Sequence, residues 1–134
     1  MVRTALLVVL LVLAAAPGAA RADAKAEARL RMERAAELHR DGKFAEALNE
    51  LTVAYTLDPQ PAMLYGIGQL HVALGDCVQA ILFYERFLST RPDPVPAAAA
   101  SEAIETCRRD PDSLKDAPAP EPAPPAEPPP PPPP

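Results

Sequence analysis

The chain has 134 residues and a formal net charge of −5, with 13 Lys and Arg residues against 18 Asp and Glu residues. An acidic chain without a Lys or Arg cluster is not expected to bind nucleic acid or an anionic membrane surface. Phe and Tyr number three each and Trp is absent, so the sequence predicts no aromatic platform for stacking nucleic-acid bases.

The N-terminal segment, residues 1–22, has the pattern of a cleaved secretory signal peptide. Arg3 supplies the short positive segment, and Ala5–Ala16 form an unbroken apolar run that Pro17 and Gly18 are expected to break. Residues 20–22 and 22–24 offer two A-x-A cleavage sites. Because a bilayer span needs about 20 apolar residues, this run is too short and a membrane helix is disfavoured. We expect a soluble mature chain, periplasmic or secreted, that begins at residue 23 or 25 and has no membrane span.

Two units, residues 28–60 and 61–93, superimpose on each other along their whole length. The matched pairs include Gly42 with Gly75, Ala47 with Ala80, Leu48 with Ile81 and Pro59 with Pro92. Each unit carries two apolar stripes at helical spacing, with a glycine just past the first and a proline just past the second, and both are helix stop signals. The two units are offset by 33 residues, and a period of this length is typical of a helical solenoid. The sequence therefore predicts an all-α fold of antiparallel helix hairpins over residues 25–109.

These two units resemble tetratricopeptide repeats, whose pattern asks for small residues, bulky residues, a turn glycine, an aromatic residue and a final proline at fixed places. Counted from Ala28, the residues at these places are Ala35, Leu38, Gly42, Phe44, Ala47, Leu51, Ala54 and Pro59. Counted from Pro61, they are Gly68, His71, Gly75, Cys77, Ala80, Tyr84, Phe87 and Pro92. Cys77 departs from the aromatic and Phe87 from the small residue. The resemblance implies two helix hairpins that bind another protein without catalysis.

Residues 95–108 are predicted to form a fifth, capping helix. Ala97, Ala100, Ile104 and Cys107 fall on one helical face, and charged residues occupy the opposite side. Two stacked repeats leave an apolar end that needs such a cap. The segment resembles the C-terminal solvating helix of the tetratricopeptide family.

The two cysteines predict a disulfide, since an even Cys count in an exported chain favours pairing. Cys77 lies at the start of the fourth predicted helix and Cys107 near the end of the fifth, so antiparallel packing brings them together. Two buried free thiols remain the alternative. A redox-catalytic pair is disfavoured because the chain has no C-x-x-C, and zinc is disfavoured because it has only two Cys and two His.

The resemblance also implies a partner-binding groove along the first helix of each repeat. The matching residues are Arg29, Met32, Ala36 and His39 in the first repeat and Ala62, Tyr65, Gln69 and Val72 in the second. Tyr65, the only aromatic side chain among them, is the expected anchor. The Lys and Asn with which some relatives hold a terminal carboxylate are replaced by Met32, Ala36 and Gly66, so a mildly apolar groove for a helix or an extended segment is expected. Alternatively, these side chains only line a solvent-facing surface.

No catalytic residue, metal site, cofactor or small-molecule substrate is predicted. His71 falls at a packing position and is expected to be a core residue with a satisfied ring, while His39 ends the groove face. Neither histidine has a nucleophile or a carboxylate at a catalytic spacing.

Residues 110–134 form a proline-rich segment that ends in seven consecutive prolines, and we expect it to be a disordered tail with polyproline II character. Its alternative role is a docking strip for an aromatic groove. The function predicted is a non-catalytic protein-interaction module of the cell envelope, with an unidentified protein or peptide partner. The alternative is a structural envelope spacer in which the tail carries the role.

Overall fold

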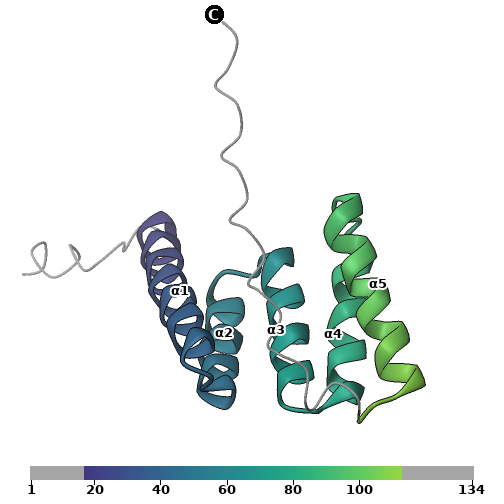
Figure 1. Ribbon diagram of the computed structural model, residues 1–134. Helices are drawn as coiled ribbons and strands as arrows, with labels where there is room; N and C mark the ends of the chain where they lie inside the picture. The colour runs from purple at the N-terminus through teal and green to yellow at the C-terminus, as the bar shows by residue number, and fades with distance from the viewer. Residues whose placement is uncertain (1–16, 113–134) are drawn as a thin grey trace, which may run out of the picture.

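The computed structural model describes residues 17–112, and five α-helices make up this part of the chain, which contains no strand. The helices are α1 (Pro17–Arg40), α2 (Phe44–Leu57), α3 (Pro61–Ala73), α4 (Cys77–Ser89) and α5 (Pro94–Arg109). Each helix packs against the next one along the chain, and the five stand side by side in chain order (Figure 1). The predicted all-α fold, a short solenoid of helix hairpins, is confirmed.

The turns inside the two repeats have the same geometry. Gly42 and Gly75 adopt φ values of 73° and 74°, a left-handed conformation that glycine enters without steric cost. After Gly42, the Lys43 N–H donates to the carbonyl of Leu38 at 2.8 Å, which closes the end of α1. The Asp76 N–H donates to the carbonyl of His71 at the same distance after Gly75. These turns fold α1 onto α2 and α3 onto α4.

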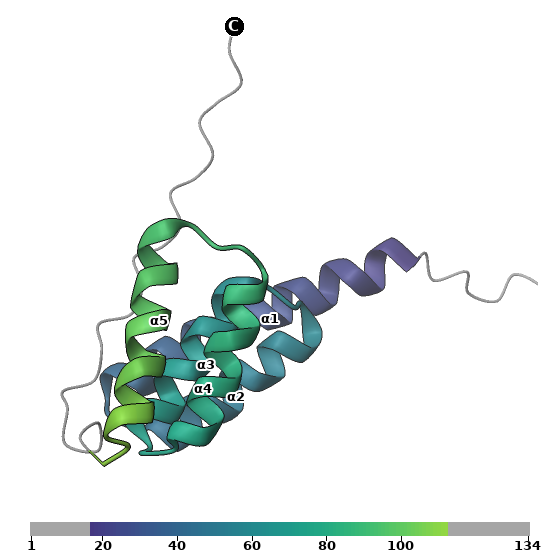
Figure 2. The same ribbon diagram turned by 90° about the vertical axis from the view of Figure 1, so that its right-hand side faces the viewer.

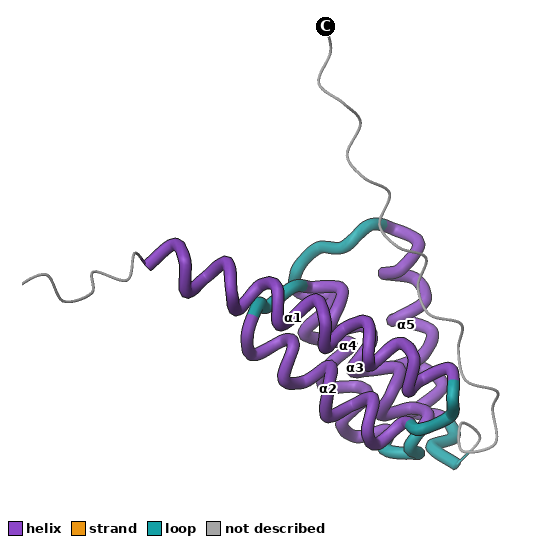
Figure 3. Tube along the Cα trace, turned by 90° about the vertical axis from the view of Figure 1, so that its left-hand side faces the viewer, coloured by secondary structure: helices purple, strands orange, loops and turns teal. Residues whose placement is uncertain are grey.

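Helix α1 begins earlier than the sequence pattern indicates. In the described residues it starts at Pro17, a residue that suits a first helical position. Its first turns are exposed and project past the body of the stack (Figures 2 and 3). The first buried residue is Ala28, the first residue of the first repeat. The apolar run up to residue 16 and the proline-rich segment from residue 113 lie outside the described residues.

Small residues allow the helices to approach one another. Ala47 and Ala80, which occupy the same place in the two repeats, are both 0% exposed. A Cβ added to Gly68 would lie 2.9 Å from the ring of Tyr84, so the aromatic ring of α4 packs directly on the α3 backbone. Tyr84 belongs to the larger core cluster, which α3, α4 and α5 build together around the two cysteines.

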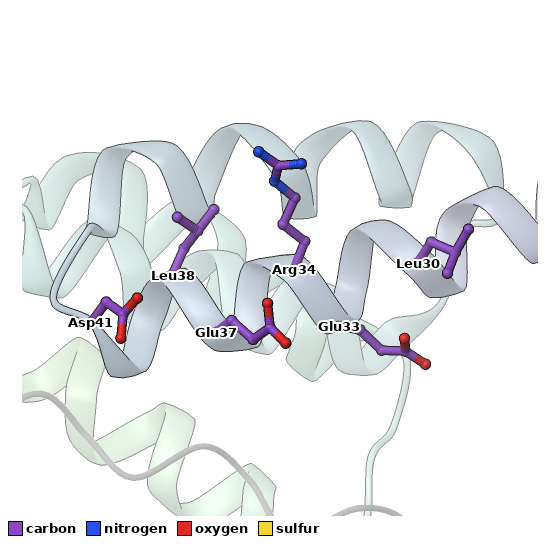
Figure 4. Close-up of a pocket in the computed structure, with 6 residues that line it drawn as sticks. All are labelled: Leu30, Glu33, Arg34, Glu37, Leu38 and Asp41. Carbon is purple, nitrogen blue, oxygen red and sulfur yellow. The ribbon is translucent and has the colours of Figure 1, made fainter.

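α1 is the first helix of the described stack (Figure 1), and one face of it carries Leu30, Glu33, Arg34, Glu37, Leu38 and Asp41 (Figure 4). When the first repeat is superimposed on the second, Arg34 corresponds to Ile67 and Glu37 to Leu70. On α3, Ile67 and Leu70 are buried core residues. On α1, the corresponding charged side chains are exposed to solvent. α1 therefore follows the repeat pattern, but it has charged residues at the positions through which α3 packs in the core.

Candidate partner-binding surface

A hollow of about 230 Å³ lies between α3 and α5, and we call it the α3–α5 hollow. Its lining consists of Tyr65, Gln69 and Val72 from α3, Tyr84 from α4, and Ala99, Glu102, Ala103 and Thr106 from α5. The α3 and α5 residues recur at helical spacings of three and four, so one face of each helix forms a wall. α5 stands at the end of the stack, with α3 and α4 behind it in Figure 2.

The disulfide between Cys77 and Cys107 fixes one wall of the hollow. Their Cα atoms lie 5.3 Å apart, and the bond joins the start of α4 to the last turn of α5. The predicted pairing is thus present, and the alternative of two free thiols is wrong. Ala100 and Ile104 add apolar contacts on the same side of α5. As a result, the α5 face bearing Ala99 and Ala103 is held toward α3.

Tyr65 lies at the hollow but is also part of the packing. Its ring centroid is 5.5 Å from that of Tyr84 and 5.3 Å from that of Phe87, in edge-on and tilted arrangements. Burial raises the pKa of Tyr65, and a hydrogen bond with the Gln69 side chain opposes this rise. Burial also raises the pKa of Tyr84, with Tyr65 as a smaller cause. Both phenols therefore stay neutral and protonated at physiological pH.

Gln69 is the one buried polar side chain among the described residues, at 6% exposure. A buried amide is costly unless its polar atoms find partners, and Tyr65 provides one of them. Val72, also 6% exposed, lies one turn further along α3. The floor of the hollow is consequently apolar with one amide in it.

The structure brings together three of the eight residues that the resemblance assigns to a groove: Tyr65, Gln69 and Val72. Ala62 is exposed at the start of α3 and does not line the hollow. The four first-repeat residues lie apart from it on α1. Of these, Arg29, Met32 and Ala36 are exposed or nearly so, and the ring of His39 packs edge-on against Phe44 at 5.4 Å. Three of the eight residues thus lie together with α5 residues at a local hollow, and the groove along both repeats stays a prediction.

The α5 residues of the hollow, Ala99, Glu102, Ala103 and Thr106, are not among the predicted site residues. The sequence pattern favours a cap for this segment, although the repeat register also places Pro61 on Pro94. When the repeat register is continued past Pro94, α5 takes the place of the first helix of a third unit. Its inner face then belongs to the same surface as that of α3.

His71 packs at the end of α3, as its position predicts, but its ring is not satisfied. The ring stacks on Phe83 with centroids 5.4 Å apart, while the buried Nδ1 has no hydrogen-bond partner. The nearest carboxylate oxygen, Oδ2 of Asp76, lies 3.6 Å from Nδ1. Burial lowers the pKa of His71, and the Asp76 charge acts in the opposite direction. The histidine is a packing residue whose buried ring nitrogen lacks a hydrogen bond.

A second hollow, of about 360 Å³, lies along the outer face of α1. In the described part of the chain its six lining side chains all come from α1, four of them charged (Figure 4). Among the described residues, one helix supplies all of its lining, and most of these side chains are exposed. We therefore regard the α3–α5 hollow as the better candidate for binding.

Residues 17–112 contain no cluster of three or more metal-ligating side chains. Among their helices, none has the length and apolar character needed to cross a bilayer. No protein-family model matches this chain, and no curated protein or solved structure matches it either.

Proposed function

We propose that this protein is a non-catalytic protein-interaction module of the tetratricopeptide type that is exported to the cell envelope. The observation that carries the proposal is the α3–α5 hollow, because three predicted groove residues line it. The repeated glycine turns and the small residues buried at matched places support the repeat assignment. The hollow would accept a segment of a partner protein.

The size and chemistry of the hollow favour a peptide over a small molecule. Its volume of about 230 Å³ is below the ~300–1,000 Å³ of ordinary small-molecule pockets. It suits one or two side chains of a longer segment. Among residues 17–112, the titratable groups that line it are one exposed carboxylate, Glu102, and the protonated phenols of Tyr65 and Tyr84. This set supports positioning of a ligand better than proton transfer.

Export is supported by two features of the chain. The apolar run and the cleavage sites belong to the N-terminal segment, and the Cys77–Cys107 disulfide is a bond that persists in oxidising compartments. Sequencing the N-terminus of material from the envelope or the medium tests this part. Chains that begin at residue 23 or 25 are expected, and an intact Met1 would contradict export.

Site-specific photo-crosslinking tests the binding function. A photoreactive residue in place of Ala99, which lines the hollow, is expected to give one defined adduct in the native envelope. The same group in place of Ser101, exposed on the same helix outside the hollow, is the matched control and is expected to give none. Equal labelling from both positions would contradict a partner at the hollow.

A structural spacer is the second candidate function, favoured by the seven consecutive prolines at residues 128–134. Such a run adopts an extended conformation of about 3.1 Å per residue. Removing residues 117–134 separates the two functions. The interaction module predicts that the adduct from position 99 survives the deletion, whereas the spacer predicts that the phenotype depends on the deleted segment alone.

A further inference from the structure

The α3–α5 hollow combines an apolar floor with a single negative charge at its rim. Val72, Tyr84, Ala99 and Ala103 supply apolar surface, and among residues 17–112 Glu102 is the only charged residue in the lining. The carboxylate of Glu102 is exposed and takes part in none of the ion pairs of residues 17–112. The hydroxyl of Thr106, one turn away, donates to the Glu102 backbone carbonyl at 2.9 Å, and this hydrogen bond does not involve the Glu102 carboxylate.

Gln69 is an independent indication that the hollow receives a polar ligand. Its amide lines the hollow and is more than nine-tenths buried, beside apolar and aromatic side chains. A glutamine amide has two donor hydrogens and an acceptor oxygen, and Tyr65 occupies only part of this capacity. The remaining groups match the N–H and C=O of a peptide backbone.

From these contacts we infer the chemistry of the ligand: a peptide segment in which a Lys or Arg neighbours a small apolar residue. The apolar side chain enters the hollow against Val72 and Ala103, the Gln69 amide bonds the peptide backbone, and the cation pairs with Glu102. A charge-assisted pair at a half-enclosed rim gives orientation as well as affinity. This inference rests on the proposed protein-binding function and specifies its partner.

The proline-rich segment of the same chain does not fit this description. Within the tail, residues 110–134, Lys115 is the only basic residue and stands against the five carboxylates of Asp110, Asp112, Asp116, Glu121 and Glu127, so the net charge of the tail has the same sign as that of Glu102. Like charges at a rim disfavour docking. Charge complementarity thus favours a basic segment from another protein over the chain's own tail.

Selection from a random peptide library tests the inference while the partner is still unidentified. The full mature chain is immobilised and presented with random dodecamers displayed on phage, in parallel with a Glu102→Lys variant. The wild type is expected to enrich peptides with Lys or Arg next to a small apolar residue. The Glu102→Lys variant is expected not to enrich these peptides. It is expected to select peptides with Asp or Glu in the position of the Lys or Arg.

Affinity measurements on one enriched peptide provide the matched comparison. Glu102→Gln is expected to weaken its binding about fivefold, the upper range for an exposed ion pair. Glu105→Gln makes the same change on the same helix, at an exposed residue outside the hollow lining, and is expected to leave the affinity within about twofold. Gln69→Leu is expected to weaken binding while preserving the circular dichroism spectrum.

The outcomes separate this inference from the proposed function. Three outcomes would overturn the inference and leave a protein-binding module. The enriched peptides could lack a basic residue or be proline-rich, or Glu102→Gln and Glu105→Gln could lose peptide affinity equally. A library that yields no binder for the wild type would overturn both.

Discussion

The contact between Gly68 and Tyr84 leaves no room for a methyl group. A Cβ on Gly68 would lie 2.9 Å from two ring atoms of Tyr84, and that ring is buried in the core. Gly68→Ala is therefore expected to lower the free energy of unfolding by ~1 kcal/mol, because overpacking costs ~1–3 kcal/mol and the gain in helix propensity offsets about 1 kcal/mol. Urea unfolding measures the change.

Gly66 provides the matched control in the same helix. A Cβ there would meet only the Cδ2 of Leu51 at 2.9 Å, which is the end of a flexible, half-buried side chain. Gly66→Ala is expected to leave stability unchanged or to raise it slightly. Equal destabilisation by the two substitutions would show that the Tyr84 contact is not the cause.

His71 predicts a loss of stability in mild acid. Burial places its pKa in the folded protein below the ordinary value of 6.5, with Asp76 as the opposing influence. Between those two pKa values the unfolded chain binds more protons than the folded one, so stability decreases as the pH falls through 6.5 and levels off below the folded pKa. Urea midpoints at about pH 7 and pH 5.5 should differ more for the wild type than for His71→Leu. An identical shift in both proteins would contradict this origin.

The junction of α4 and α5 depends on a covalent bond. The Cys77–Cys107 disulfide closes a loop with a sequence separation of 30 residues, and both cysteines are buried. The double variant Cys77→Ser with Cys107→Ser is expected to lose ~3–4 kcal/mol, from the conformational freedom that the loop constraint removes from the unfolded chain. Thermal unfolding with and without a reductant measures the loss. Two titratable thiols in denatured, unreduced protein would contradict the pairing.

On α1, the first described helix, Arg34 and Glu37 are exposed at the places that buried Ile67 and Leu70 take on α3, and Arg34 also pairs with Glu50 of α2 at 3.6 Å. Arg34→Ile combined with Glu37→Leu gives α1 the side chains of Ile67 and Leu70, and with Leu30 it forms an exposed apolar strip. This variant is expected to self-associate with its fold intact, as measured by sedimentation at several concentrations. Arg29→Ile, a change at an exposed residue on another side of α1, is the control. Monomeric behaviour of the double variant would show that these charges do not keep the chains apart.

The repeat register allowed most helix limits to be predicted from the sequence. α2 begins at Phe44 and α4 at Cys77 because Gly42 and Gly75 turn the chain just before them. The early start of α1 was missed because its first turns bury nothing. Alanine and charged residues form helix there through propensity, which leaves no apolar stripe.

The hollow was predicted only in part, for a different reason. Tyr65, Gln69 and Val72 were expected from the resemblance to tetratricopeptide repeats. Their pairing with Glu102 depends on how far α5 leans over α3, which is set by packing and by the disulfide. Sequence periodicity predicts which residues share one face of a helix, but it does not predict the angle at which two helices cross.

The position of the disulfide makes the candidate binding surface depend on the redox environment of the chain. α5 supplies one wall of the hollow, and its last turn is tied to α4 through Cys107. In a reducing cytoplasm that wall would be held by side-chain packing alone, and it would be completed when the thiols meet an oxidising environment. If the chain is exported and binds a partner as proposed, a newly made chain would be a weak binder in the cytoplasm and a competent one after oxidation. Formation of the disulfide would then be the step that completes the surface.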